Sequence, residues 1–144
     1  MKVSTKGRYG LRAVIDLIIN SNGENVPLIT IAERQDISKN YLEQVFSSLR
    51  KAGIVNSTKG AQGGYYLADK PSNITIGDVL RVLEGDLSVV NSDPDSQENL
   101  IEQCIQKNVW DKIDNQVNEI IDGITLEDLV NEIRNDSNIL MYYI

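Results

Sequence analysis

Seven residues around position 40 have side chains that can hydrogen-bond to the edges of DNA bases, and their spacing places them at one end and on one face of a helix. They are Ser38, Lys39, Asn40, Tyr41, Glu43, Gln44 and Ser47. Asn and Gln can pair with adenine, Lys can reach guanine or phosphate, and Glu can accept a hydrogen bond from cytosine. Because a recognition helix presents its N-terminal residues to the major groove, this segment is a candidate for reading DNA. The alternative is the solvent-exposed polar face that any amphipathic helix has.

A glycine-rich stretch over residues 58–64 follows and could form a second contact with DNA. Lys59 and Gln62 lie among the glycines, the first of which is Gly60. Glycine lets a backbone approach its ligand closely, and Lys and Gln can contact phosphate or the minor groove. A tight turn without a ligand is the alternative, although a turn needs glycine and does not need Lys and Gln beside it.

The first residues of the chain combine basic side chains with the expected start of a helix. The set is Lys2, Ser4, Thr5, Lys6, Arg8 and Arg12. A helix N-terminus binds phosphate through free backbone N–H groups and the helix dipole. Several such contacts would make binding to DNA steeply dependent on salt. We therefore expect a third contact with the DNA backbone here.

The charge of the chain is unevenly distributed. The formal net charge is −7, but residues 1–70 hold ten Lys and Arg against six Asp and Glu, whereas residues 71–144 hold four against fifteen. This asymmetry is typical of a protein whose first half alone binds an acidic partner. A chance distribution with a solvated acidic helix is the alternative.

The residue types exclude several kinds of chemistry. The chain has no histidine and one cysteine, Cys104. His-based acid–base catalysis, Ser-His-Asp and Cys-His pairs and an all-cysteine metal site within one chain are therefore excluded, and we expect neither an enzyme nor a metal protein. There is no apolar run of 18 residues and no hydrophobic leader at the first residues, so we expect a cytoplasmic protein with no membrane partner.

Hydrophobic periodicity predicts a mainly α fold with one small β-hairpin. The predicted helices cover residues 4–20, 30–35, 38–52 and 75–84. Thr30 and Ser38 are the expected N-caps of the second and third helices, and Gly53 ends the third. Two β-favouring runs, 54–57 and 65–68, flank the glycine-rich stretch and predict a hairpin. A helix-turn-helix followed by a hairpin is a winged helix, which is the expected fold.

The second half of the chain is predicted to be a dimerisation region. A helix over 99–122 would be about 36 Å long, too long to bury its apolar stripe on so small a body. We expect the stripe to pack partly against a second subunit. Its residues are Ile105, Val109, Ile113, Val117, Ile120 and Ile121. A further short helix should start at Thr125 with Asp128 at its third position. The expected division is a DNA-binding domain (1–85), a flexible loop (86–98) and a helical dimerisation region (99–144).

The same residues resemble a bacterial family of winged-helix repressors, the Rrf-two (Rrf2) family, which includes an iron–sulfur cluster regulator and a cysteine-metabolism repressor. The matching stretches are residues 4–10, 38–46, 49–55, 63–67 and 124–129. The resemblance implies a homodimer crossed through the long helix on a near-palindromic operator in double-stranded DNA. It implies that bases or backbone are read by Ser38, Asn40, Tyr41, Glu43 and Gln44, and that the wing contact is made by Ser57, Lys59 and Gly60.

The chain departs from the cluster-binding members of that family. Those members resemble one another in having three cysteines, with a histidine three residues after the last. Here Cys104 falls at the third position, and Lys107 occupies the histidine position. We therefore expect no iron–sulfur cluster and no other cofactor. The closer resemblance is to the cysteine-metabolism subgroup, which implies sulfur or cysteine supply genes as targets and cysteine synthase as a partner.

Two further interpretations stay open at this point. Cys104 is interpreted as a small buried hydrophobe, with a redox sensor as the alternative. The protein could also respond to a small molecule, or the winged helix could bind a protein surface in place of DNA.

Overall fold

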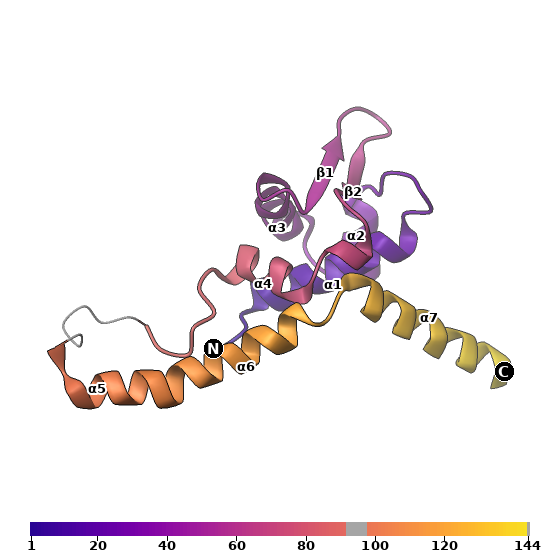
Figure 1. Ribbon diagram of the computed structural model, residues 1–144. Coiled ribbons are helices and arrows are strands. Elements are labelled where there is room, and N and C mark those ends of the chain that lie inside the picture. The colour runs from indigo at the N-terminus through magenta and orange to yellow at the C-terminus, as the bar shows by residue number, and fades with distance from the viewer. Residues whose placement is uncertain (92–97, 144) are drawn as a thin grey trace.

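The computed structural model describes residues 1–91 and 98–143, with side chains as far as residue 137. The predicted fold class is confirmed, because the described chain is mostly helical with an antiparallel two-stranded hairpin (Figure 1). The body contains α1 (Thr5–Asn20), α2 (Leu28–Gln35), α3 (Lys39–Lys51), β1 (Val55–Thr58), β2 (Gly64–Leu67) and α4 (Ile76–Glu84).

The core of the body lies where its four helices meet. Apolar residues recur along α3 at steps of three and four, so Leu42, Phe46 and Leu49 share one face and are fully buried. They pack with Leu17 of α1 and Ile31 of α2, which are also fully buried. Each such side chain contributes about 2 kcal/mol by leaving water. The opposite, polar face of α3 is thereby fixed toward solvent.

The turn between α2 and α3 forms as the sequence predicts, but α2 begins earlier than expected. Ser38 is the N-cap of α3, and its Oγ accepts a hydrogen bond from the Tyr41 backbone N–H at 3.4 Å. The prediction that Thr30 caps α2 is wrong. The helix begins at Leu28 after Pro27, which places Thr30 in its first turn, where its Oγ1 donates to the Pro27 carbonyl oxygen at 2.7 Å.

The hairpin forms a wing anchored to the body at two points. Val26 exchanges two backbone hydrogen bonds with Tyr65, each 2.9 Å long, and so forms an isolated antiparallel bridge to β2. The Tyr65 ring packs edge-on against Phe46 with centroids 4.9 Å apart. A Cβ on Gly64 would lie 2.5 Å from the Val26 carbonyl oxygen. Glycine is therefore needed at Gly64 for close packing of the wing on the body.

The predicted long helix is confirmed as a rod with an internal irregularity. It consists of α5 (Leu100–Ile105), a π-helical segment (Gln106–Trp110) and α6 (Asp111–Asp122). The Asn99 side chain caps its start by accepting from the backbone N–H groups of Ile101 and Glu102. The far end reaches the body, where Arg81 of α4 donates two hydrogen bonds to Asp122, of 2.7 and 2.8 Å. Figure 1 shows α5 extending well away from α1 and α4.

The last helix, α7 (Leu126–Tyr143), is longer than the short helix expected from the sequence. Its predicted start is confirmed, since Thr125 Oγ1 accepts from the Asp128 N–H and the Asp128 carboxylate accepts from the Thr125 N–H. Leu126 and Val130 are buried in the core. Beyond them α7 extends to the opposite side of the body from α5 (Figure 1).

The predicted flexible loop over 86–98 falls partly outside the described residues, which omit 92–97. Its first part is attached to the rod. Leu87 is buried, and the Val89 N–H donates to Asp114 Oδ1 at 2.8 Å. Within the described ranges, no helix is both long and apolar enough to cross a bilayer.

Candidate nucleic-acid interface

The polar face of α3 has the geometry expected of a recognition helix. Ser38, Lys39, Asn40, Glu43 and Gln44 are all exposed. Tyr41 and Ser47 are half-buried at the edges of this face. Burial of the opposite side of α3 leaves these groups free to meet a ligand, apart from the Ser38 hydroxyl that caps α3 and a loose ion pair of 3.7 Å between Lys39 Nζ and Glu43 Oε1.

The wing and α3 enclose a common hollow on the surface. It has a volume of about 430 Å³ and is lined by Leu28, Glu43, Arg50, Ser57, Thr58, Lys59, Gly64 and Tyr65. Glu43 from α3 and Ser57 and Lys59 from the wing therefore line the same hollow, and their contact with DNA stays a prediction. Gly60 at the hairpin tip has φ of 106°, a conformation that glycine adopts readily, and Gln62 beside it is exposed.

Arg50 is a residue of this hollow that sequence reasoning missed. Its place in the last turn of α3 indicates by itself only a cation that complements the helix dipole. It is exposed and shares the hollow with Lys59, which adds a second positive charge on the side of α3 that faces the wing. The sequence does not show that the wing lies beside the last turn of α3, so it could not assign Arg50 to the interface.

The start of α1 differs from the expected phosphate site. Glu84 at the end of α4 points its Oε1 at this helix terminus and accepts hydrogen bonds from the Ser4 N–H (2.9 Å), the Ser4 hydroxyl (2.6 Å) and the Gly7 N–H (3.0 Å). A protein carboxylate thus takes the place expected for a phosphate, and Ser4 is used internally. Sequence reasoning could not find a partner 80 residues away. Lys2, Thr5 and Arg8 are exposed and Lys6 is half-buried, so their contact with DNA stays a prediction.

Arg12 connects α1 with both helices of the helix-turn-helix. Its Nη2 donates to the Gln35 carbonyl oxygen at 2.8 Å, at the end of α2. Its guanidinium lies 5.1 Å from the centre of the Tyr9 ring, and Tyr9 meets Tyr41 of α3 edge-on at 6.2 Å. Arg12 therefore holds the helix-turn-helix in place, a role that its charge alone did not indicate.

A buried carboxylate within α1, Asp16, is a second feature that sequence reasoning missed. It accepts three hydrogen bonds from Arg34, the shortest 2.7 Å, and one of 2.8 Å from Gln35 Nε2. Hydrogen bonding to Asp16 raises the pKa of Arg34. The available signal was an acidic residue inside the apolar run from Val14 to Ile18.

The apolar stripe of the rod is largely exposed in a single chain. Exposed fractions are 74% for Ile101, 40% for Val109 and Ile113, and 60% for Ile120. Ile105 and Val117 are half-buried. Ile121, which the sequence assigned to the dimer surface, is only 8% exposed and belongs to the core of its own chain.

The preferred interpretation of Cys104 as a buried hydrophobe is wrong, because the side chain is exposed. The rod extends away from the body at this point, so no core is present to cover the thiol. Asn108 Nδ2 lies 3.5 Å from its Sγ. Among the residues that the structure describes, no three Cys, Asp or Glu side chains are grouped in a way that could hold a metal ion.

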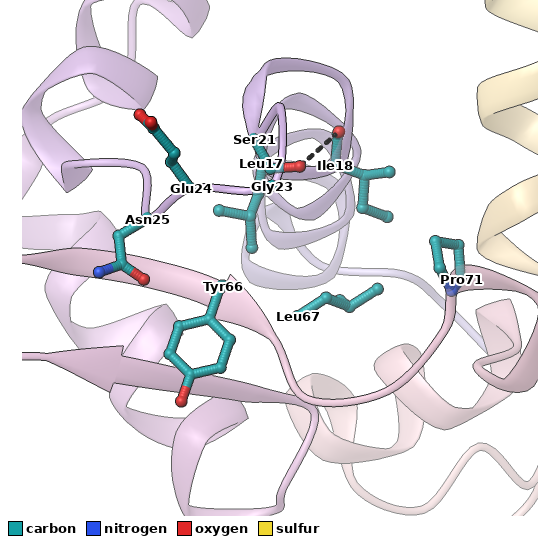
Figure 2. A pocket seen from close by; sticks show the side chains of 9 residues that line it. All are labelled: Leu17, Ile18, Ser21, Gly23, Glu24, Asn25, Tyr66, Leu67 and Pro71. Atoms are coloured by element: carbon teal, nitrogen blue, oxygen red, sulfur yellow. Dashed lines mark hydrogen bonds between the residues drawn. The ribbon is translucent and has the colours of Figure 1, made fainter.

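A second hollow, of about 450 Å³, lies between the wing and the end of α1. Figure 2 shows the side chains that line it: Leu17, Ile18, Ser21, Gly23, Glu24, Asn25, Tyr66, Leu67 and Pro71. Its apolar side chains come from α1, β2 and a 3-10 turn (Pro71–Asn73), whereas the Glu24 carboxylate points away from them (Figure 2).

Comparison with known proteins agrees with this geometry. The Rrf2 family, described as an iron-dependent transcriptional regulator, matches residues 3–132. The chain is 42% identical to the HTH-type transcriptional regulator CymR of Bacillus subtilis over 144 residues, which is all of both chains. It is 36% identical to the HTH-type transcriptional regulator IscR of Escherichia coli K12 over 131 residues, covering 91% of this chain and 81% of that one.

Solved structures show the same similarity. The structure of B. subtilis CymR, described as the global cysteine regulator, has a TM-score of 0.77 at 42% identity and covers 92% of this chain and 98% of its own. The structure of T. potens IscR has a TM-score of 0.72 at 44% identity, covering 92% and 88%. These relatives are transcriptional regulators.

Proposed function

Because the chain belongs to the Rrf2 family of DNA-binding transcriptional regulators, we propose that α3 and its wing bind a near-palindromic operator and that binding represses the adjacent genes. The observation that supports this most strongly is the common hollow in which Glu43 of α3 lies beside Lys59 of the wing. A recognition helix in the major groove with a basic wing on the neighbouring backbone is a known way of reading duplex DNA.

This proposal is tested by titrating the purified protein with labelled genomic fragments at low and moderate salt. Binding that weakens steeply with salt is expected, because Lys and Arg contacts to phosphate release counterions. A complete lack of binding at low salt would contradict it and would favour the alternative of a protein-interaction module.

We also propose that the active form is a homodimer. The exposed apolar stripe of the rod, which includes Ile101, Val109, Ile113 and Ile120, supports this, since soluble proteins rarely leave such a surface uncovered. In this arrangement residues 1–85 contact DNA and residues 99–144 join the subunits. Light scattering should give a molar mass twice that of one chain, which is 16.1 kDa. A mass equal to that of one chain at working concentrations would contradict the proposal.

An iron–sulfur cluster does not fit this chain, although the family is described as iron-dependent. A cluster of this type needs three or four thiolate or imidazole ligands. The sequence offers one cysteine and no histidine, and Lys107 follows where an imidazole would be required. We therefore propose regulation without a cluster. Protein purified without oxygen should be colourless, and an iron–sulfur absorption band would overturn this.

The similarity to a cysteine regulator leads us to propose that the target genes serve sulfur and cysteine supply in the cytoplasm. From the same resemblance we propose cysteine synthase as a partner enzyme. Adding purified cysteine synthase to the protein–DNA complex should change the mobility of the complex in a gel. An unchanged mobility at micromolar enzyme would count against the partnership.

A redox role for Cys104 is a second candidate, which its exposure favours. Exposed thiols are open to oxidation by peroxide to a sulfenic acid. Under this candidate, Cys104→Ser abolishes a peroxide-induced loss of DNA binding. If wild-type and Cys104→Ser proteins respond equally to peroxide, the candidate is rejected.

A further inference from the structure

A third hollow, of about 200 Å³, lies where the end of α4 meets the rod. Its polar side chains are Arg81 of α4, Asp86 and Ser88 of the segment after α4, and Asp114 and Asn118 of α6. Groups of the body and groups of the rod therefore face one space. None of these residues lines the hollow between α3 and the wing, so the two hollows are separate.

The lining of the third hollow carries charges of both signs. Asp86 and Asp114 contribute carboxylates, and Arg81 contributes a guanidinium. The hydrogen bond from the Ser88 backbone N–H lowers the pKa of Asp86 below its ordinary 3.8, so this carboxylate is charged at neutral pH. A carboxylate accepts hydrogen bonds from an ammonium group, whereas a guanidinium donates them to a carboxylate. The hollow therefore offers partners for both ends of a zwitterion.

The donors of the hollow are only partly used by the protein itself. Arg81 has five N–H donors and gives three hydrogen bonds, two to Asp122 and one to Asn118. This leaves two N–H groups of the guanidinium without a partner among the residues that the structure describes. Asn118 takes part through its Oδ1, so its Nδ2 can donate to a ligand. A carboxylate in the hollow can thus be bound by an arginine and an amide.

The acceptors of the hollow also keep capacity for a ligand. Asp114 Oδ1 accepts from the Val89 N–H at 2.8 Å, and Asp86 Oδ1 accepts from the Ser88 N–H at 2.9 Å. A charged carboxylate has about four acceptor sites. Both carboxylates can therefore accept further hydrogen bonds from an ammonium group.

The size of the hollow restricts the ligand to a small one. At about 30 Å³ for each water-sized group, 200 Å³ holds about seven non-hydrogen atoms. This is the size of serine or alanine, whereas phenylalanine is too large. A metal ion is a poorer match, because no three Cys, Asp or Glu side chains of the described residues are grouped to hold one. A metal ion would also leave the guanidinium unused.

We propose that this hollow binds a small α-amino acid of the size of serine or alanine. The ammonium group binds to Asp86 and Asp114, and the carboxylate accepts from Arg81 and from Asn118 Nδ2. The bound molecule joins two groups of the body to two groups of the rod, and so fixes the rod relative to the body that carries α3. The site depends neither on the homodimer nor on DNA binding proposed above.

Calorimetric titration of the purified full-length protein with L-serine tests the class of ligand. We expect a dissociation constant of about 1 mM or tighter. Ethanolamine lacks the carboxylate of serine, and glycerate has a hydroxyl in place of its ammonium group. Each should bind about tenfold more weakly than L-serine, because each leaves one charged partner unused. L-Phenylalanine should not bind, because of its size.

The results of these titrations separate the possible kinds of site. No binding of L-serine at about 10 mM would overturn the proposal. Equal affinity for ethanolamine would show a site for cations alone, and equal affinity for glycerate a site for anions alone, and either result would overturn it too. The titrations contain no DNA, so their failure leaves the proposed DNA binding untouched.

Replacing Asp86 by Asn tests whether the ligand lies in the hollow. This change removes the charged partner of the ammonium group and keeps an acceptor for the Ser88 N–H. The affinity for L-serine should fall about tenfold. Asp136→Asn, the same change at an exposed position outside the hollow, is the control. Unchanged affinity in Asp86→Asn, or an equal loss in the control, would place the ligand elsewhere.

Replacing Asn118 by Asp tests the other end of the ligand. The new side chain still accepts from Arg81, but it repels the carboxylate of L-serine. The affinity for L-serine should fall about tenfold, whereas ethanolamine should bind no more weakly than before. Asn115→Asp, at an exposed position of α6 outside the hollow, is the control, and thermal unfolding shows that each variant is folded. If L-serine binds folded Asn118→Asp as tightly as the wild type, its carboxylate does not lie in the hollow.

Discussion

Asp16 on α1 and Arg34 on α2 form an ion pair in which Arg34 Nη2 lies 2.7 Å from Asp16 Oδ1, and the Asp16 side chain is only 3% exposed. Gln35 adds a hydrogen bond to the same carboxylate. Because α2 packs directly on α3, this contact sets the position of α3, the proposed recognition helix, relative to α1.

Replacing Asp16 by Asn should lower the free energy of unfolding by about 2 kcal/mol. The carboxylate is buried, but Arg34 can regain water, so the cost falls below that of breaking a fully buried pair. Urea unfolding followed by circular dichroism measures the effect, with Glu33→Gln on the exposed side of α2 as the control. An unchanged unfolding midpoint in Asp16→Asn would show that the pair does not stabilise the helix-turn-helix.

Replacing Glu84 by Ala should destabilise the protein by about 1–2 kcal/mol, because the first turn of α1 loses the acceptor of three hydrogen bonds. Hydrogen exchange should show the loss concentrated at the N–H groups of Ser4 and Gly7. Glu127→Ala, at an exposed position on α7, is the matched control. Unaltered exchange at Ser4 and Gly7 would mean that the Glu84 contact is not maintained in solution.

The ion pair between Arg81 and Asp122 predicts that the free energy of unfolding depends on pH. The hydrogen bond from Arg81 lowers the pKa of Asp122 below its ordinary 3.8. A carboxyl group with a lowered pKa in the folded state stabilises the fold above its unfolded pKa, and this stability is lost as pH falls. Asp122→Asn should therefore be less stable than the wild type at neutral pH and should lose less stability between about pH 5 and pH 2. Parallel acid curves for the two proteins in a denaturant titration would contradict this, and Asp136→Asn serves as the control.

Replacing Gln44 by Ala should relax base preference. Gln44 is exposed on the outer face of α3, where its amide can pair with a base edge. Affinity for a selected operator should fall by about 1–3 kcal/mol, whereas affinity for random duplex should change little. Competition binding with the two DNAs measures the difference. An equal loss for both DNAs would assign Gln44 to the backbone.

Replacing Lys59 by Ala should weaken binding without relaxing base preference, unlike Gln44→Ala. Lys59 is exposed on the wing, where it can neutralise a phosphate. Binding to all sequences should weaken, and the slope of log affinity against log salt should fall by about 1. Lys70→Ala, which removes an exposed charge outside the hollow between α3 and the wing, is the control. A salt slope that is unchanged in Lys59→Ala would remove Lys59 from the interface.

Local signals predicted the local elements well. The apolar steps along α3, its Ser38 cap and the glycines of the hairpin each indicate a structure decided by near neighbours in the sequence. The capping pair of Thr125 and Asp128 is of the same kind. The recognition-helix face and the wing residues could be named for this reason.

Contacts between distant segments could not be predicted in this way. The contact of Glu84 with the first turn of α1 and the ion pair of Arg34 with Asp16 depend on how the helices cross. The spacing of residues along the chain does not encode this crossing. The burial of Ile121 and the exposure of Cys104 depend on where the rod leaves the body. The early start of α2 does have a local signal, because the fixed φ of Pro27 suits the beginning of a helix at Leu28.

Selection of duplexes bound by the protein from a genomic library, followed by sequencing, tests the central claim most directly. Repeated enrichment of one near-palindromic motif is predicted for the wild-type protein, with weaker enrichment for Gln44→Ala. A bound pool with the same sequence composition as the starting library would contradict sequence-specific reading by α3 and the wing.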